Sequence, residues 1–195
     1  SNLEALLSDD TFTITSGQQI HIFLGPVFVW YKMYSLITLA KEAIDQLADK
    51  RIVPVFWMAT EDHDLEEISK VNLYNETYQW ETTQKGAVGR MHTNGLTEIA
   101  DQLLERIDDS SLNKDFLKLC RDAYEQSENL SQASRKIIHE TFKSFGLLVI
   151  DPDDDLLKES FNGVVSWDLY KRGSQNKIEA VNEKLAALGY TPQIN

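Results

Sequence analysis

The stretch IVPVFWMA, residues 52–59, decides the fold because it contains no charged or polar side chain. A short, continuously apolar run is typical of a strand in a parallel sheet, where helices cover both faces. Ahead of it, residues 27–50 form a largely apolar pattern that predicts a helix, and Pro26 suits its first turn. TFTIT, residues 11–15, predicts an earlier strand. Strand, helix and strand in this order make a βαβ unit.

The rest of the chain continues the alternation of strands and helices. A third strand is predicted over LLVID, residues 147–151, and ISKVNLYNETYQWET indicates two short strands or one strand with a turn. Helical patterns cover residues 96–107, 113–126, 131–145, 153–161 and 174–188, and a short helix begins near Asp64. The pattern predicts an α/β fold, a doubly wound parallel sheet with an additional helical lobe. We expect residues 1–195 to form one core, with a helical insertion at about 96–145.

Composition limits the function classes open to the chain. A net charge of −12 over 195 residues argues against a general nucleic-acid binder, since such proteins need a basic face. The single cysteine, Cys120, lies at an apolar helical position, which predicts a buried structural thiol. We find no apolar run of membrane-spanning length and no signal-peptide pattern, so we expect a cytoplasmic protein without a membrane partner. The start at Ser1-Asn2 rather than Met suggests a piece of a longer protein.

Three polar clusters follow the three predicted strands. They are Ser16-Gly17-Gln18-Gln19, Thr60-Glu61-Asp62-His63-Asp64 and Asp151-Pro152-Asp153-Asp154. The carboxyl ends of parallel strands meet at one edge of a sheet, where ligands bind, so we expect the clusters to line a cleft. Each cluster also has a structural explanation. The first cluster is equally typical of a turn at Gly17. Asp64 is typical of a helix N-cap, and Asp154 and Asp155 are typical of the start of a helix.

Cationic groups near these clusters suggest an anion site. Gly25-Pro26 precedes the long helix, whose N-terminal amides suit a phosphate or carboxylate. Lys32 lies one to two turns further on, where it either reaches solvent or neutralises a bound anion. KGAVGRM places Lys85 and Arg90 around two glycines, as in a mobile surface loop or in a lid that closes on an anionic substrate.

The EDHD segment is the strongest local signal for chemistry. Carboxylates beside His63 favour its imidazolium form, which suits an acid–base or charge-stabilising role. Aspartate and histidine together are also ligands for a divalent metal. His21, His92 and His139 show no ligand spacing relative to this segment, so we prefer a metal-free polar site.

Longer blocks of the sequence carry a resemblance to a known family. SGQQIHIFLGPVFVWYKMYSLITLAKEA and PVFWMATEDHDLEEISKV, in this order and spacing, resemble the bacillithiol biosynthesis cysteine-adding enzyme family. GAVGRM and FGLLVIDPDDDLLK are similar to its later blocks, so the resemblance covers essentially the whole chain. It implies a Rossmann-like core with a coiled-coil arm, in a protein longer than this chain. It also implies a homodimer formed through a segment beyond this chain.

The resemblance also implies an activity. Members of the family add L-cysteine to the amine of glucosaminyl-malate in the last step of bacillithiol biosynthesis. The chain would then belong to a carbon–nitrogen ligase that uses ATP or another nucleotide, with no metal assigned. Asp62, His63 and Asp64 would be its catalytic residues. The residues expected to bind substrate are Ser16, Gly17, Gln18, Gln19, Gly25, Lys32, Thr60, Glu61, Arg90 and Asp151.

Two other functions stay open from the sequence. One is a metal-dependent hydrolase or phosphoesterase, with Asp62, His63, Asp64 and Asp151 as ligands of Mn or Mg. The other is a non-catalytic ligand-binding or scaffolding module, in which the acidic cluster is solvated and the helices form a partner surface.

Overall fold

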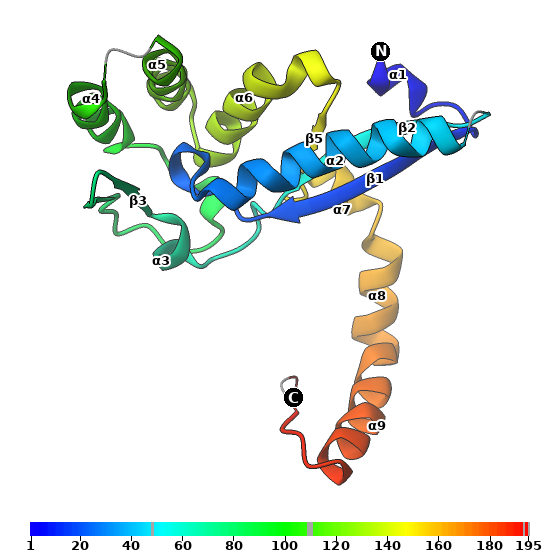
Figure 1. The fold of residues 1–195 in the computed structure, drawn as a ribbon. Coiled ribbons are helices and arrows are strands. Elements are labelled where there is room, and N and C mark those ends of the chain that lie inside the picture. Colours follow the sequence, from blue (N-terminus) through cyan, green and yellow to red (C-terminus); the bar gives the residue numbers. More distant parts are fainter. Residues whose placement is uncertain (48, 109–110, 193, 195) are drawn as a thin grey trace. The chain divides into compact units, whose positions relative to one another are not determined.

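The computed structural model describes residues 1–47, 49–108, 111–192 and 194 (Figure 1). The chain divides into two compact units, Ser1–Asp153 and Asp154–Asn195. The first unit contains the sheet and the helices predicted around it.

The first unit is built on a three-stranded sheet in the order β1-β2-β5. The strands are β1 (Thr11–Gln18), β2 (Arg51–Met58) and β5 (Leu148–Ile150), and both pairs are parallel. β2 is central, and its apolar residues are buried at five of eight positions, as the continuous apolar run predicts. In the part of the chain that the structure describes, β1 pairs with β2 alone, so its other edge is open.

Helix α2 (Val27–Gln46) connects β1 to β2. It buries one stripe of side chains, which consists of Val29, Met33, Leu36, Ile37 and Ala40. This spacing of three to four residues places the stripe on one face, and that face packs on the two strands. Figure 1 shows α2 running alongside β1. The predicted βαβ unit is confirmed, and the helix ends at Gln46 rather than at Lys50.

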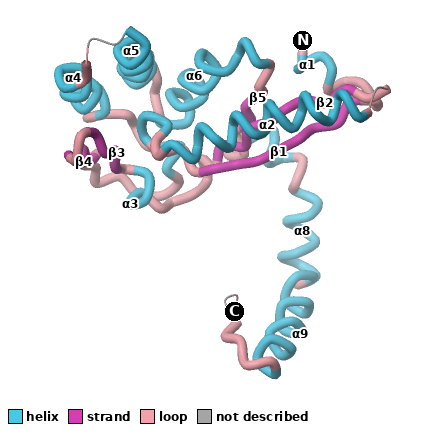
Figure 2. Tube along the Cα trace, in the orientation of Figure 1, coloured by secondary structure: helices cyan, strands magenta, loops and turns pink. Residues whose placement is uncertain are grey.

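A small hairpin follows the sheet strand β2. Helix α3 (Leu65–Ile68) leads into β3 (Lys70–Leu73) and β4 (Glu76–Gln79), which pair antiparallel (Figure 2). The two residues between the strands, Tyr74 and Asn75, have positive φ angles of 49° and 66°. Two-residue hairpin turns need this backbone because its twist matches that of the strands. The alternative of two short strands in this segment is therefore the one observed.

Three helices complete the first unit. They are α4 (Leu96–Arg106), α5 (Ser111–Gln126) and α6 (Leu130–Phe142), and each packs on the next. α6 also contacts β5 and the 3-10 turn η2 (Val88–Arg90), so this helical group and the sheet share one hydrophobic core. Cys120 of α5 is fully buried, which confirms the predicted structural thiol, and burial raises its pKa far above the usual value.

The second unit consists of α7 (Asp155–Glu159), α8 (Asn162–Lys171) and α9 (Gly173–Ala187). The sequence predicted helices at 153–161 and 174–188 but none over 162–171. Gly163 and the β-branched Val164 and Val165 have low helix propensity, which hides α8 in the sequence. No residue of these three helices is fully buried. Over the described ranges, no helix is both long and apolar enough to cross a bilayer.

Candidate functional site

The first polar cluster lies mostly inside a strand. β1 extends through Ser16, Gly17 and Gln18, so of the two alternatives left open for these residues, the turn is not formed. Gly17 stands opposite Trp57 in β2. A Cβ atom at Gly17 would lie 2.9 Å from the Trp57 carbonyl oxygen and 3.1 Å from the Trp57 Cβ. Glycine is needed here for the close approach of Trp57 rather than for a turn.

Gln19 joins the first cluster to the second. Its Nε2 donates to Asp62 Oδ2 at 2.8 Å and to Glu67 Oε2 at 2.9 Å, and its Oε1 accepts from Gln18 Nε2 at 3.1 Å. The structure therefore brings together two clusters that are more than forty residues apart, as the parallel strands predicted. Glu67 was missed because it lies on α3, outside the polar run; only its place one turn after Asp64 hinted at it.

Lys32 reaches back from α2 to the end of β1. Its Nζ donates to Gln18 Oε1 at 2.6 Å and to the Gly17 carbonyl oxygen at 3.2 Å. These acceptors are neutral, and none of the described carboxylates forms an ion pair with this half-buried ammonium group. Its positive charge thus remains uncompensated beside the start of α2. A Cβ atom on the nearby Gly25 would make only ordinary contacts, at 3.8 Å or more, so glycine is not required there by packing.

Asp62 is the best-held acid of the second cluster. Its Oδ1 accepts from the backbone amides of His63 at 2.6 Å and Asp64 at 3.1 Å. Burial raises the pKa of Asp62, but the hydrogen bonds from the Asp64 amide, the Gln19 side chain and the His63 amide lower it by more. Its pKa therefore lies below the ordinary value of 3.8. At neutral pH this group is a carboxylate that accepts hydrogen bonds, not a proton donor.

The other residues of the EDHD segment behave differently from Asp62. Asp64 caps α3, because its Oδ1 accepts from the Glu67 amide at 3.2 Å. This is the structural explanation given for Asp64 above. His63 and Glu61 are exposed. Asp64 is thus occupied in capping the start of α3, whereas the side chains of Asp62 and His63, the other two predicted catalytic residues, cap no helix.

Asp151, of the third cluster, accepts a hydrogen bond from Thr60 of the second. Its two carboxylate oxygens accept hydrogen bonds from the hydroxyls of Thr60 and Ser131, and Oδ1 also accepts from the Asp153 amide at 3.0 Å. Thr60 is fully buried. Asp151 therefore fastens the ends of β2 and β5 to the start of α6, which is a positioning role. Ser131 was missed because a serine near a helix start is common and gives no signal of its own.

The glycine-containing loop is also fastened at this edge. Arg90 forms a two-pronged ion pair with Asp153, with Nε–Oδ2 and Nη2–Oδ1 distances of 2.5 and 2.9 Å. The Gly89 amide donates to the Thr60 carbonyl oxygen at 2.9 Å, and a Cβ atom at Gly89 would lie 2.6 Å from the Thr60 Cβ. The Val88 amide donates to the Asp62 carbonyl oxygen at 2.7 Å. Closure of this loop as a lid stays a prediction.

His21 is a buried histidine beside this network. It is 4% exposed, and its Nε2 has no hydrogen-bond partner among the described residues. Its ring packs edge-on against Phe28, at 6.2 Å between ring centroids. Burial lowers the pKa of His21, and the carboxylate of Glu67 raises it by less. The imidazole is therefore held neutral at physiological pH. Sequence reasoning noted only that it lacked ligand spacing.

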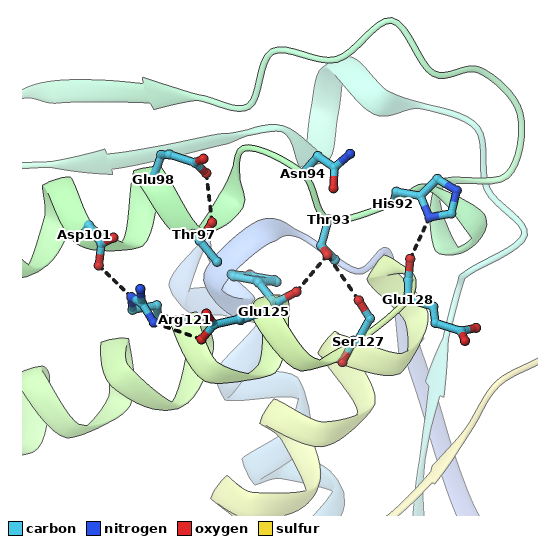
Figure 3. Close-up of a pocket in the computed structure, with 11 residues that line it drawn as sticks. His92, Thr93, Asn94, Thr97, Glu98, Asp101, Arg121, Glu125, Ser127 and Glu128 are labelled. Atoms are coloured by element: carbon cyan, nitrogen blue, oxygen red, sulfur yellow. Dashed lines mark hydrogen bonds and ion pairs between the residues drawn. The ribbon is translucent and has the colours of Figure 1, made fainter.

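A hollow of about 520 Å³ lies between α4, α5 and the loop at residues 92–94 (Figure 3). Its polar side chains largely bond to one another or to nearby backbone. Arg121 bridges Asp101 at 2.7 Å and Glu125 at 3.1 Å, and the Thr93 hydroxyl donates to the Tyr124 carbonyl oxygen at 2.8 Å. These contacts join α4 to α5, so we interpret the hollow as part of the helix packing.

In the ranges that the structure describes, no group of three or more histidine, cysteine, aspartate or glutamate side chains is arranged to hold a metal ion. Asp62 and Asp151, both proposed as ligands above, instead bind amide and hydroxyl groups of the protein.

Comparison with known proteins identifies the family of the chain. The family model described as the N-terminal Rossmann-like domain of BshC, of bacillithiol biosynthesis, matches residues 1–195. The chain belongs to this family. The Rossmann-like α/β fold, predicted from the resemblance, is confirmed by this match and by the parallel sheet.

Full-length relatives carry the same domain. Proteins named "Putative cysteine ligase BshC" from Cytophaga hutchinsonii and Flavobacterium johnsoniae are each 38% identical to the chain over 194 residues, covering all of it. A Staphylococcus aureus protein of the same name is 28% identical over 163 residues, or 78% of the chain. The chain spans 35% and 36% of the lengths of the first two relatives. It is thus similar to about a third of each.

Proposed function

We propose that this chain forms the Rossmann-like part of a cysteine ligase that joins L-cysteine to the amine of glucosaminyl-malate in bacillithiol biosynthesis. One observation carries the proposal: hydrogen bonds connect Lys32 of α2, through Gln18 and Gln19 at the end of β1, to the carboxylates of Asp62 and Glu67. Membership of the BshC family supports the same reaction. Cytoplasmic location, a coiled-coil arm and a homodimer belong to this proposal as further expectations.

The network contains charges of both signs, which suits amino-acid and sugar–acid substrates. Asp62 and Glu67 share the Gln19 amide, so two carboxylates stand side by side where a substrate ammonium group would bind. Lys32, whose present partners are neutral oxygens, would bind a substrate carboxylate or phosphate. ATP or another nucleotide would activate the cysteine carboxyl, and Lys32 with the start of α2 would hold its anionic groups.

His63 is the proposed proton acceptor for the amide-forming step. When the amine nitrogen attacks the activated acyl carbon, a C–N bond forms, the bond to the leaving group breaks, and the nitrogen loses a proton. The His63 side chain is exposed, and its backbone amide donates to the Asp62 carboxylate at 2.6 Å, so the imidazole stands next to the charged network and open to a substrate. Asp62, with its lowered pKa, supplies charge rather than a proton.

The test uses the full-length protein with L-cysteine, glucosaminyl-malate and ATP, and mass spectrometry detects the cysteinyl adduct. We expect His63→Ala to lower the rate by about 10²-fold or more. The matched control is His92→Ala. His92 is another exposed histidine, and it lines the hollow between α4 and α5. No adduct from the folded wild-type protein would contradict the proposed reaction. Equal rates for the two variants would remove His63 from the mechanism.

A further inference from the structure

Another cavity begins at the amino end of β2 and extends along α6 and β5. It measures about 980 Å³, which is in the range of small-molecule sites. It is lined by Arg51 and Leu148, the first residues of β2 and β5, and by one side of α6. Arg51 lies at the amino end of the eight-residue strand β2, which is about 26 Å long, whereas Val149 lies one residue from the end of β5. No residue of the proposed ligase site is among the described residues that line the cavity.

The cavity is strongly basic in an acidic chain. Five of its lining side chains are cationic or titrate to a cation; they are Arg51, Arg135, Lys136, His139 and Lys143. Among the described residues that line it, none is acidic. On α6, the spacing of residues 132, 135, 136, 139 and 143 places these side chains along one face of the helix and the turn after it. The basic side chains are therefore held on regular elements, namely α6, the turn after it and β2.

Most of these charges lack a carboxylate partner. The Lys136 ammonium donates to the Gln126 side-chain oxygen at 2.5 Å, and the Arg51 guanidinium to the Asn2 side-chain oxygen at 3.2 Å. Of these five side chains, Lys143 alone forms an ion pair with a described carboxylate, at 2.5 Å from the partly exposed Glu140.

Two glutamates outside the lining feel this basic field. The pKa of Glu140 is lowered, mainly by its hydrogen bond from Lys143 and with smaller effects of His139 and Lys136. Arg51 makes a small contribution to the lowered pKa of Glu4, whose main cause is the amino terminus. Glu140 therefore offsets part of the charge of these basic side chains, chiefly that of Lys143.

The opposite wall is apolar. Leu147 is buried, and Leu148 and Val149 are half-buried where they line the cavity. A ligand here would meet several cationic groups on one side and an aliphatic surface on the other. We propose that this cavity binds a small polyanion, a molecule with two or more phosphate or carboxylate groups, at a site separate from the proposed ligase site.

Calorimetric titration of the full-length protein tests the proposal, with pyrophosphate and tricarballylate as separate probes. The Arg51→Gln, Arg135→Gln double variant removes one cation from each of two walls. The control is Lys70→Gln, Lys118→Gln, which makes the same change in net charge at exposed positions away from the cavity. We expect wild type and control to bind, and the double variant to bind at least about tenfold more weakly, because charge-assisted hydrogen bonds are lost.

A further variant separates this cavity from the proposed ligase site. Lys32→Gln, on α2, removes the cation of the proposed ligase site; it should abolish only binding of the probes at that site and keep the binding that depends on Arg51 and Arg135. Tighter binding of pyrophosphate would identify the ligand class as phosphorylated, and tighter binding of tricarballylate as polycarboxylate; either supports the proposal. No binding of either probe, equal binding to the double variant, or loss of binding only in Lys32→Gln would overturn it. Failure here leaves the ligase proposal untouched, since that is measured by adduct formation.

Discussion

Single residues at the candidate site divide into those that hold the site together and those that are open to a ligand. Asp64, Asp151 and Thr60 use their side chains for a helix cap or for hydrogen bonds between loops. The His63 side chain is exposed, and Lys32 donates to the neutral oxygens of Gly17 and Gln18, so both keep charge or proton chemistry for a ligand. The sequence placed all five near one sheet edge but did not separate these two roles. The separation depends on which atom each side chain reaches, and no spacing rule encodes that.

Gly17 gives a prediction at the residue scale. Gly17→Ala places a Cβ atom against the Trp57 backbone, and the two strands cannot part without breaking their ladder. We expect a loss of about 1–3 kcal/mol in the free energy of unfolding, measured by urea denaturation. Gly163→Ala is the control, since open space surrounds that position on α8. Equal stability of the two variants would show that β1 and β2 tolerate a wider separation.

His21 predicts how stability depends on pH. Burial lowers its pKa below the ordinary value of 6.5, with Glu67 opposing, so the unfolded chain binds a proton more readily than the folded chain. The stability that His21 permits is complete above about pH 6.5 and falls as the pH drops through the folded-state pKa.

Chemical denaturation at about pH 7.5 and about pH 5.5 measures this effect. The wild-type protein should be less stable at the lower pH, and His21→Leu should show a smaller difference. His63→Ala, which changes an exposed histidine, should keep the wild-type difference. A His21→Leu variant with the full difference would assign the effect to other groups.

At the scale of elements, hydrophobic periodicity was a reliable guide and local polarity was not. The βαβ unit and helices α4 to α6 follow from apolar patterns whose burial the structure confirms. β1 was predicted three residues too short, because Ser16, Gly17 and Gln18 read as loop residues although they continue the ladder with β2. α8 was missed because its residues are poor helix formers. For β1, pairing with β2, which is not visible along the sequence, overrides local preference.

Ser131 gives a prediction for how α6 is joined to the sheet. Its hydroxyl donates to the ionisable carboxyl group of Asp151, which follows β5. Ser131→Ala should lower the free energy of unfolding by about 2 kcal/mol, because Asp151 loses a hydrogen-bond donor in a partly buried position. Ser144→Ala, at an exposed serine, should change stability little. Equal effects in urea denaturation would mean that the hydrogen bond to Asp151 contributes nothing net.

At the scale of the whole chain, the two units differ in how well they are packed. Unit Ser1–Asp153 has a continuous core, whereas no residue of α7, α8 or α9 is fully buried. Large apolar side chains such as Trp167 and Tyr170 are 49% and 83% exposed. Helices that bury so little gain little stability from packing. The sequence showed the helical character of α7 and α9 but not that residues 154–195 form a compact unit of their own.

Limited proteolysis of the chain 1–195 tests this difference. Cleavage requires local opening, which costs least where few apolar contacts are formed. Trypsin should cut first after a lysine or arginine within residues 154–195, for example at Lys158 or Lys171, and a fragment close to residues 1–153 should persist. Mass spectrometry of the fragments identifies the sites. First cuts inside residues 1–153 would contradict the assignment of stability to that unit.

The open edge of β1 has a practical consequence for handling the isolated chain. The strand reads TFTITSGQ, with no charged residue and no proline along its eight positions. Natural edge strands usually carry such residues because they prevent pairing with a second molecule. Concentrated solutions of residues 1–195 should therefore self-associate through β1, visible as a rising apparent mass in light scattering. Thr13→Lys, at an exposed position of that strand, should keep the sample monodisperse.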